Sequence, residues 1–161
     1  MKCLAGTFEL VSLAGRGAFA DVWRGIHATE GYPAAIKIPR GHGYATPRLD
    51  EGFLREVRST ARLDHPGIID IWDHGRLTQP IHPSADDFYD QGTPFFVMEW
   101  IDGGTLSSTL SGLDWPTLQR TLLHLLGALS TAHARGIIHR DIKPDNILMA
   151  PRGPVLSDFG I

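Results

Sequence analysis

Residues 138–146 read IHRDIKPDN, and residues 157–160 read SDFG. The first stretch places Asp141, Lys143 and Asn146 in one tight turn, and the second adds a further carboxylate after a short apolar run. A carboxylate can accept a hydroxyl proton, an ammonium can neutralise a phosphoryl group, and carboxylate and amide oxygens bind hard cations. Polar turns rich in Asp and Asn are common, but few also carry Lys-Pro and precede Asp-Phe-Gly. The two stretches therefore indicate phosphoryl-transfer chemistry.

His139 stands beside Asp141 and could be taken for a base or a metal ligand. No second His or Cys lies at ligand spacing from it, so we interpret it as a packed histidine that supports the turn. Cys3 is the only cysteine, which excludes an internal disulfide and a thiolate zinc cluster.

The composition is that of a soluble globular protein, with 42% hydrophobic and 20% charged residues in a chain of 161. Such a length suits one domain, or one small lobe and part of a second. A net charge of -3 gives no general attraction to nucleic acid or to an anionic membrane, so phosphate binding must be local. No apolar run is long enough for a membrane segment and the N-terminus does not read as a signal peptide, so we expect a cytoplasmic location.

The first part of the chain has the apolar alternation of strands, with one stretch of helical spacing. A glycine-rich turn joins the first two strands as a hairpin, and the polar segment 76–93 is expected to be an exposed loop. We expect strands over 8–13, 22–26, 34–38, 68–72 and 94–101, and a helix over 49–63.

The second part is richer in helical spacing. Residues 102–104 read as a linker, a short helix is expected over 106–110, and a long helix over 116–135 is capped by Asp114 and ended by Gly136. Two short apolar strands, 147–149 and 154–157, close the chain.

Two features of the first part point to a ligand, each with a plainer alternative. Gly15 and Gly17 would let backbone amides approach a phosphate, although a tight hairpin turn alone accounts for the same glycines. Lys37 lies in an apolar strand and needs a partner, for which Glu56 on the inward face of the next helix is the candidate. Alternatively, the stem of Lys37 runs to the surface and its ammonium stays in water.

Taken together, these motifs resemble the amino-terminal part of a eukaryotic-type (Hanks-type) serine/threonine protein kinase domain. Lys143, which follows Asp141 by two positions, resembles the serine/threonine kinases rather than the tyrosine kinases. Five motifs occur in the order of that family: Gly15-x-Gly17-x-Phe19-Ala20-x-Val22, Ala34-Ala35-Ile36-Lys37, Glu56, His139-Arg140-Asp141 through Asn146, and Asp158-Phe159-Gly160.

The resemblance implies ATP and Mg²⁺ as cofactors and a protein with Ser or Thr as substrate, with no nucleic-acid partner. Asp141 would be the catalytic base and Lys143 would steady the γ-phosphate, while Asn146 and Asp158 would hold Mg²⁺. The residues implied for nucleotide binding are Gly15, Gly17, Ala20, Val22, Ala35, Lys37, Glu56, Met98, Glu99 and Ile101.

The resemblance also implies an α+β, bilobal fold. We expect a kinase N-lobe over 1–101, with an antiparallel five-stranded sheet and one main helix, and a partial C-lobe over 102–161. Because the chain ends directly after Asp-Phe-Gly, we expect a fragment of a longer kinase whose activity on its own is doubtful. The alternatives are a nucleotide-binding, pseudokinase-like or interaction fragment, and a small-molecule kinase of similar fold.

Overall fold

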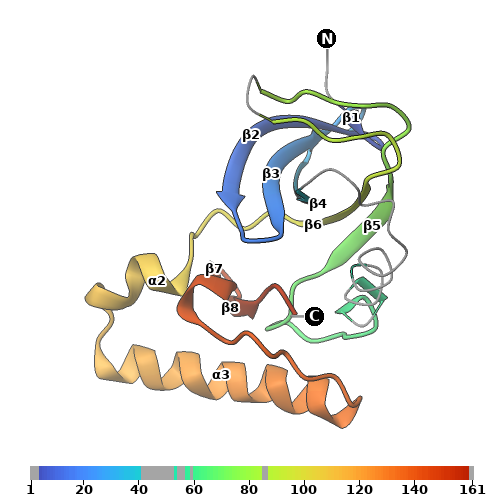
Figure 1. Ribbon diagram of the computed structural model, residues 1–161. Coiled ribbons are helices and arrows are strands. Elements are labelled where there is room, and N and C mark those ends of the chain that lie inside the picture. Colours follow the sequence, from blue (N-terminus) through green and yellow to red (C-terminus); the bar gives the residue numbers. More distant parts are fainter. Residues whose placement is uncertain (1–3, 41–52, 54–56, 59, 85–86, 160–161) are drawn as a thin grey trace. The chain divides into compact units, whose positions relative to one another are not determined.

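The chain divides into two compact units in the computed structural model, which describes residues 4–40, 53, 57–58, 60–84 and 87–159 (Figure 1). The first unit comprises Met1–Val57 and Ile71–Trp100, and the second comprises Arg58–Asp70 and Ile101–Ile161. Residues 58–70 thus group with the second unit, although we had expected them within a lobe over 1–101. The reason is a long-range pairing within that unit, since the amide of Ile69 donates to the carbonyl of Leu156 at 2.9 Å.

The first unit is built on one antiparallel sheet with the strand order β1-β2-β3-β4-β6-β5. Its bounds are β1 Leu4–Ala5, β2 Phe8–Arg16, β3 Ala20–His27, β4 Pro33–Pro39, β5 Ile71–Arg76 and β6 Pro94–Glu99. The expected five strands are present, and the two-residue β1 makes a sixth.

The strand expected over 68–72 was placed too early in the sequence, because β5 begins at Ile71. Ile68 and Ile69 are almost fully buried, and Ile68 bridges to Leu156 in the second unit. Most of the helix expected over 49–63 lies outside the described residues. Residues 53, 57, 58 and 60 are helical, whereas 61–63 are not, so the expected end was placed too late.

The two faces of the sheet carry different sets of side chains, and one face forms the core of this unit. Trp23, Ile36 and Val97 are register partners on adjacent strands, and all belong to the main core of this unit. Side chains alternate across a strand, so the preceding or following residues occupy the opposite face. The hydrophobic alternation of the sequence therefore fixes which side chains are left for a ligand.

Over its described residues, the segment 76–93 is not the exposed loop that its polarity predicts. Leu77, Ile81 and Tyr89 are each at most 3% exposed and belong to the core of the sheet. The segment is closed at its base by backbone hydrogen bonds from Leu77 to Thr93 and from Gly92 to Leu77. The three buried side chains point inward although their neighbour Phe88 is 38% exposed, a difference that composition alone does not reveal.

The second unit consists of helices and one hairpin. Its elements are α2 Leu106–Thr109, η1 Leu110–Gly112, α3 Trp115–Ala134, η2 Pro144–Asn146, β7 Ile147–Ala150 and β8 Gly153–Leu156. The long helix begins as expected, since the side chain of Asp114 accepts a hydrogen bond from the amide of Thr117 at 2.9 Å. Its end is followed by Gly136 at a φ of 72°, the conformation that favours glycine after a helix.

The core of this unit gathers Ile68, Leu106, Leu125, Ile147 and Leu156. The hairpin of β7 and β8 thus packs beside α3 and presents the ends of both strands to the polar turns that flank them. Within the described ranges, we find no helix whose length and apolarity would allow it to cross a membrane.

Candidate active site

The polar turn of the second unit brings together three of the residues singled out by the sequence. The ammonium of Lys143 lies 2.7 Å from Oδ2 of Asp141. The amide nitrogen of Asn146 donates to the same Oδ2 and to the backbone carbonyl of Asp141, both at 2.9 Å. Because η2 begins at Pro144, the chain turns back on itself and both donors can reach one carboxylate.

The side chains of Asp141 and Lys143 are kept in their ionised forms. Hydrogen bonds from Lys143 and from Asn146 lower the pKa of Asp141 below its usual range. The hydrogen bond to Asp141 raises the pKa of Lys143. The side chains are 52% and 48% exposed respectively, so the pair stays accessible to a substrate.

His139 is completely buried and contacts the backbone of the turn, as interpreted from the sequence. The backbone amide of Asp141 donates to Nδ1 at 3.3 Å, so Nε2 carries the proton and donates to the carbonyl of Ser157 at 2.9 Å. The ring also packs against Phe159, with 4.5 Å between the centroids. One neutral imidazole therefore links the polar turn of Asp141 to Ser157 and Phe159.

Acidification should weaken this link. Burial lowers the pKa of His139, against weaker opposing effects of Ser157, Asp158 and Asp141. The stabilisation is therefore full above the pKa of the unfolded chain, near 6.5, and is lost as pH falls through the lower folded value. We expect the free energy of unfolding to drop between pH 7.5 and 5.5 more steeply than in His139→Gln, by up to about 1.4 kcal/mol per pH unit. Urea unfolding at several pH values measures the difference, and parallel slopes for the two proteins would contradict it.

Asn146 and Asp158, the expected metal ligands, lie at the ends of the β7–β8 hairpin. Ser157 connects them, because its amide donates to the carbonyl of Asn146 at 2.9 Å. Asp158 has a φ of 57°, a conformation uncommon outside glycine that is often found at functional sites.

The donor set fits Mg²⁺ rather than a metal held by protein alone. Among the described residues, no group of three or more His, Cys, Asp or Glu could hold an ion. Mg²⁺ commonly takes one or two protein oxygen ligands and completes its shell with water and substrate phosphates. One amide and one carboxylate on adjacent strand ends meet that requirement.

In the first unit, the glycine-rich turn between β2 and β3 is closed by a hydrogen bond from the amide of Gly17 to the carbonyl of Ala20 at 2.8 Å. A Cβ at position 17 would lie 3.0 Å from that carbonyl oxygen, so a side chain there would crowd the turn. No described atom lies within 4 Å of a Cβ built on Gly15, which leaves open space beside its backbone. The turn can therefore present its backbone to a phosphate.

The sheet face opposite the core collects the other expected nucleotide contacts. Val22 pairs with Lys37, and Ala35 pairs with Met98. These four residues share one face, and the Lys37 ammonium lies 5.6 Å from the ring centroid of Phe96, the next residue in the row.

This row on the sheet does not include three further residues that were expected to bind the nucleotide, Glu99, Ile101 and Glu56. Glu99 is 8% exposed at the end of β6, whereas Ile101 already belongs to the second unit. Glu56, the expected partner of Lys37, lies outside the described residues.

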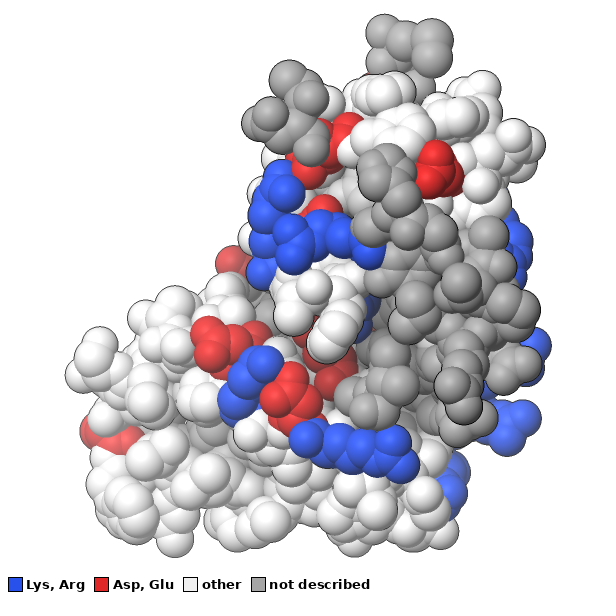
Figure 2. All heavy atoms as spheres, in the orientation of Figure 1, with Lys and Arg blue, Asp and Glu red and all other residues white. Residues whose placement is uncertain are grey.

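Figure 2 shows Lys and Arg side chains interspersed with Asp and Glu on the visible face, in keeping with the small net charge of -3.

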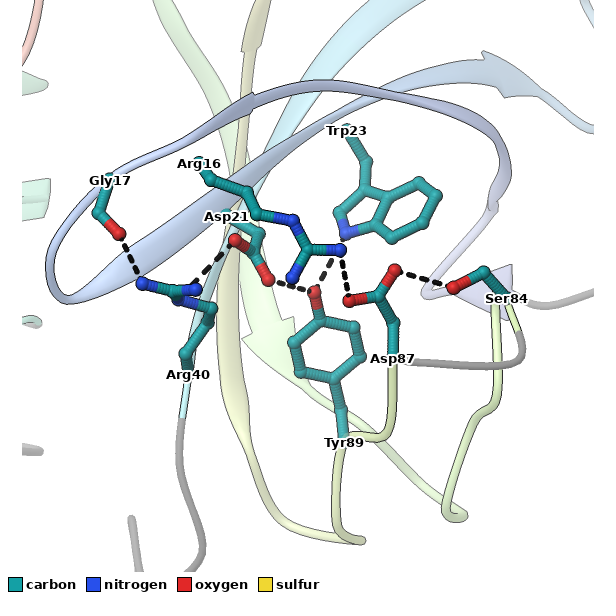
Figure 3. A network of polar contacts seen from close by, with 8 residues as sticks. All are labelled: Arg16, Gly17, Asp21, Trp23, Arg40, Ser84, Asp87 and Tyr89. Atoms are coloured by element: carbon teal, nitrogen blue, oxygen red, sulfur yellow. Dashed lines mark hydrogen bonds and ion pairs between the residues drawn. The ribbon is translucent and has the colours of Figure 1, made fainter.

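A network of polar contacts surrounds the glycine-rich turn and was not predicted from the sequence (Figure 3). It comprises Arg16, Gly17, Asp21, Trp23, Arg40, Ser84, Asp87 and Tyr89. The one available signal was Asp21, a charged residue directly before the strand expected over 22–26, which needs a partner when it is buried.

Comparisons with known proteins agree with this geometry. A family model described as the protein kinase domain matches residues 8–161. The probable serine/threonine-protein kinase SCO3848 of Streptomyces coelicolor is 37% identical over 164 residues, which cover 98% of this chain and 23% of that protein. Serine/threonine-protein kinase PknA of Mycobacterium tuberculosis is 36% identical over 163 residues, covering 98% of this chain and 36% of that protein.

Solved structures give the same result. The kinase domain of Mycobacterium tuberculosis PknI superimposes with a TM-score of 0.74 at 26% identity, covering 99% of this chain and 62% of that one. The apo form of PpkA-294 gives a TM-score of 0.75 at 26% identity, covering 99% and 60%. The chain thus spans between 23% and 36% of the length of the two curated relatives cited above.

Proposed function

Because this chain belongs to the protein kinase domain family, we propose that it transfers the γ-phosphoryl group of ATP to serine or threonine hydroxyls of protein substrates. The observation that carries the proposal is the convergence of Lys143 and Asn146 on one carboxylate oxygen of Asp141. A general base, a cation for a phosphoryl group and an oxygen ligand for a metal are then within one turn.

Asp141 is the proposed base toward the substrate hydroxyl. Its Oδ2 is held by two donors, and no described residue donates a hydrogen bond to its Oδ1, so that oxygen can accept one from a hydroxyl. As the hydroxyl oxygen bonds to the γ-phosphorus, the bond from that phosphorus to the bridging oxygen breaks and ADP leaves, while the proton of the hydroxyl passes to this carboxylate. The lowered pKa of Asp141 keeps the carboxylate ionised throughout the neutral range.

Lys143 is proposed to hold the transferring group in place, and Asn146 and Asp158 to bind Mg²⁺. When bound, Mg²⁺ would neutralise charge on the phosphates and orient them for in-line transfer. The positive φ of Asp158 directs the chain sharply after β8, and Ser157 ties that position to Asn146. The chain's own role is therefore to keep two oxygen ligands and one ammonium in a fixed arrangement.

Apart from Ile101, the proposed nucleotide contacts are residues of the first unit. Val22, Ala35 and Met98 offer an apolar surface for the base, and Lys37 on the same face would contact phosphates, with Glu56 as its partner. The remaining contacts would come from backbone atoms of Gly15, Gly17, Ala20, Glu99 and Ile101. An enzyme that consumes ATP must reach the ATP pool, for which we propose the cytoplasm.

The proposal is tested by transfer of radiolabelled phosphate from ATP to a generic basic protein, followed by phosphoamino-acid analysis. We expect label on serine and threonine and none on tyrosine. Magnesium removal by a chelator should abolish the transfer, and added Mg²⁺ should restore it. Absence of transfer from a longer protein that contains this domain would overturn the proposal.

A further inference from the structure

The segment 77–93 packs against the glycine-rich hairpin and contacts both residues that flank its turn. Arg16, the last residue of β2, and Asp21, the second residue of β3, are register partners across the hairpin. Each is bound by a side chain of the segment, as Figure 3 shows. A segment with only a packing role would need neither contact.

The first contact joins Arg16 to Asp87. One guanidinium nitrogen lies 2.6 Å from Oδ1 of Asp87, and the hydroxyl of Ser84 donates to Oδ2 at 2.6 Å. Asp87 is 6% exposed, and the hydrogen bonds from Ser84 and Arg16 lower its pKa and keep it charged. A buried, ionised acceptor with both oxygens engaged is a directional anchor for the arginine.

The second contact joins Asp21 to Tyr89. The Tyr89 hydroxyl donates to Oδ2 of Asp21 at 2.7 Å and accepts from the indole nitrogen of Trp23 at 2.8 Å. Asp21 is 1% exposed, and its other oxygen faces the guanidinium of Arg40 at 3.4 Å. This chain of bonds fixes the start of β3.

Arg40 completes the arrangement by reaching the turn itself. Its guanidinium donates to the carbonyl of Gly17 at 2.6 Å, and its backbone amide donates to the carbonyl of Phe19 at 2.9 Å. The turn is thus held on its own backbone and at both flanks. Phe19 at its tip remains 76% exposed, so the tip stays open to solvent.

We propose that Asp87 and Tyr89 are positioning residues for nucleotide binding, which hold Arg16 and Asp21 so that the backbone of the glycine-rich turn keeps one conformation. This inference rests on the proposed function, because it assigns the phosphate contact to that turn. A turn ordered in advance loses less conformational freedom when it binds a phosphate, so its affinity is higher. Loosening the anchors should weaken ATP binding and leave the rate of the chemical step nearly unchanged.

The experiment compares the wild type with Asp87→Asn, Tyr89→Phe, Arg16→Met and the double variant Arg16→Met/Asp87→Asn. Glu30→Gln is the matched control, because it removes one negative charge from an exposed turn of the same unit. Hydrogen exchange reads the protection of the Gly17 and Arg40 amides, both hydrogen bonded in this turn. Fluorescence titration with N-methylanthraniloyl-ATP and Mg²⁺ gives the Kd, and initial rates separate KM for ATP from kcat.

For Asp87→Asn and Tyr89→Phe we expect exchange of these two amides to accelerate, and the Kd and KM for ATP to rise about threefold to tenfold, with kcat within twofold of wild type. The double variant should be no worse than Arg16→Met alone, because the two residues act as a unit. Unchanged exchange and Kd in both single variants, or equal changes in Glu30→Gln, would overturn the positioning role. If the wild type binds no nucleotide, the proposed function fails, and the exchange data alone decide whether the segment orders the turn.

Discussion

Replacing Asp141 by asparagine is expected to lower kcat for phosphoryl transfer by about 10²–10⁴-fold, because the variant removes the only carboxylate proposed to accept the substrate proton. Asparagine has the same shape and can still accept from the amide of Asn146, so the turn should keep its conformation. Lys143 would lose its charged partner but remains 48% exposed and hydrated. The loss should therefore appear in catalysis and not in folding.

The matched control for this variant is Asp145→Asn, which neutralises an exposed carboxylate of the same turn. It should retain activity within a small factor. The Kd of the fluorescent ATP analogue should be similar in wild type and both variants, and the melting temperatures should agree within a few degrees. An Asp141→Asn protein that transfers phosphate at the wild-type rate would remove Asp141 from the role of base.

Replacing Gly103 by alanine is expected to destabilise the second unit by about 3 kcal/mol, the upper part of the usual range for overpacking. A Cβ at this position would lie 1.7 Å from the carbonyl oxygen of Met149 in β7. The obstacle is backbone, which cannot rotate away as a flexible side chain can. The neighbouring carbonyl of Gly104 accepts from the amide of Met149 at 2.9 Å, so any displacement also strains this hydrogen bond.

Thermal unfolding followed by circular dichroism measures this effect, and a loss of about 3 kcal/mol corresponds to a fall in Tm of roughly 6–12 °C for a chain of this size. Gly112→Ala is the control, since a Cβ there meets nothing within 4 Å and Gly112 has no positive φ. An unchanged Tm in Gly103→Ala would show that the contact with Met149 is looser than the structure indicates.

The parts of the site that sequence predicts well are those whose residues are close together in the chain. Asp141, Lys143 and Asn146 lie within one turn, so the residue types and their spacing are enough to bring them together. The sheet face with Val22, Lys37 and their partners also follows from sequence, because strand alternation decides which residues share a face.

Contacts between distant segments could not be predicted in this way. Tyr89 and Asp21 are separated by 68 positions, and the local pattern around either residue does not indicate that the other is its partner. The sequence predicts an exposed loop over 76–93 because its polar residues outnumber its apolar ones. Its buried residues Leu77, Ile81 and Tyr89 are isolated in sequence and meet only in the folded core.

The predicted start of β5 was wrong for a related reason. Ile68 and Ile69 form an apolar pair that would suit a strand of the first sheet, and their spacing gives no preference between two partners. Both residues pair instead with Leu156 of β8, Ile68 through a β-bridge and Ile69 through a backbone hydrogen bond. Tertiary pairing decided between two equally good local interpretations.

This assignment of residues 58–70 also bears on the order in which the protein can fold during synthesis. A ribosome releases Ile68 and Ile69 long before it makes Leu156, and until then these apolar residues have no native partner in β8. Non-local pairing of this kind closes a long loop and forms late in folding. The first unit can assemble its sheet from residues up to Trp100, whereas the second must wait for β8. Nascent chains stalled before β8 should therefore be sensitive to proteolysis at 58–70 while the strands of the first sheet are already protected.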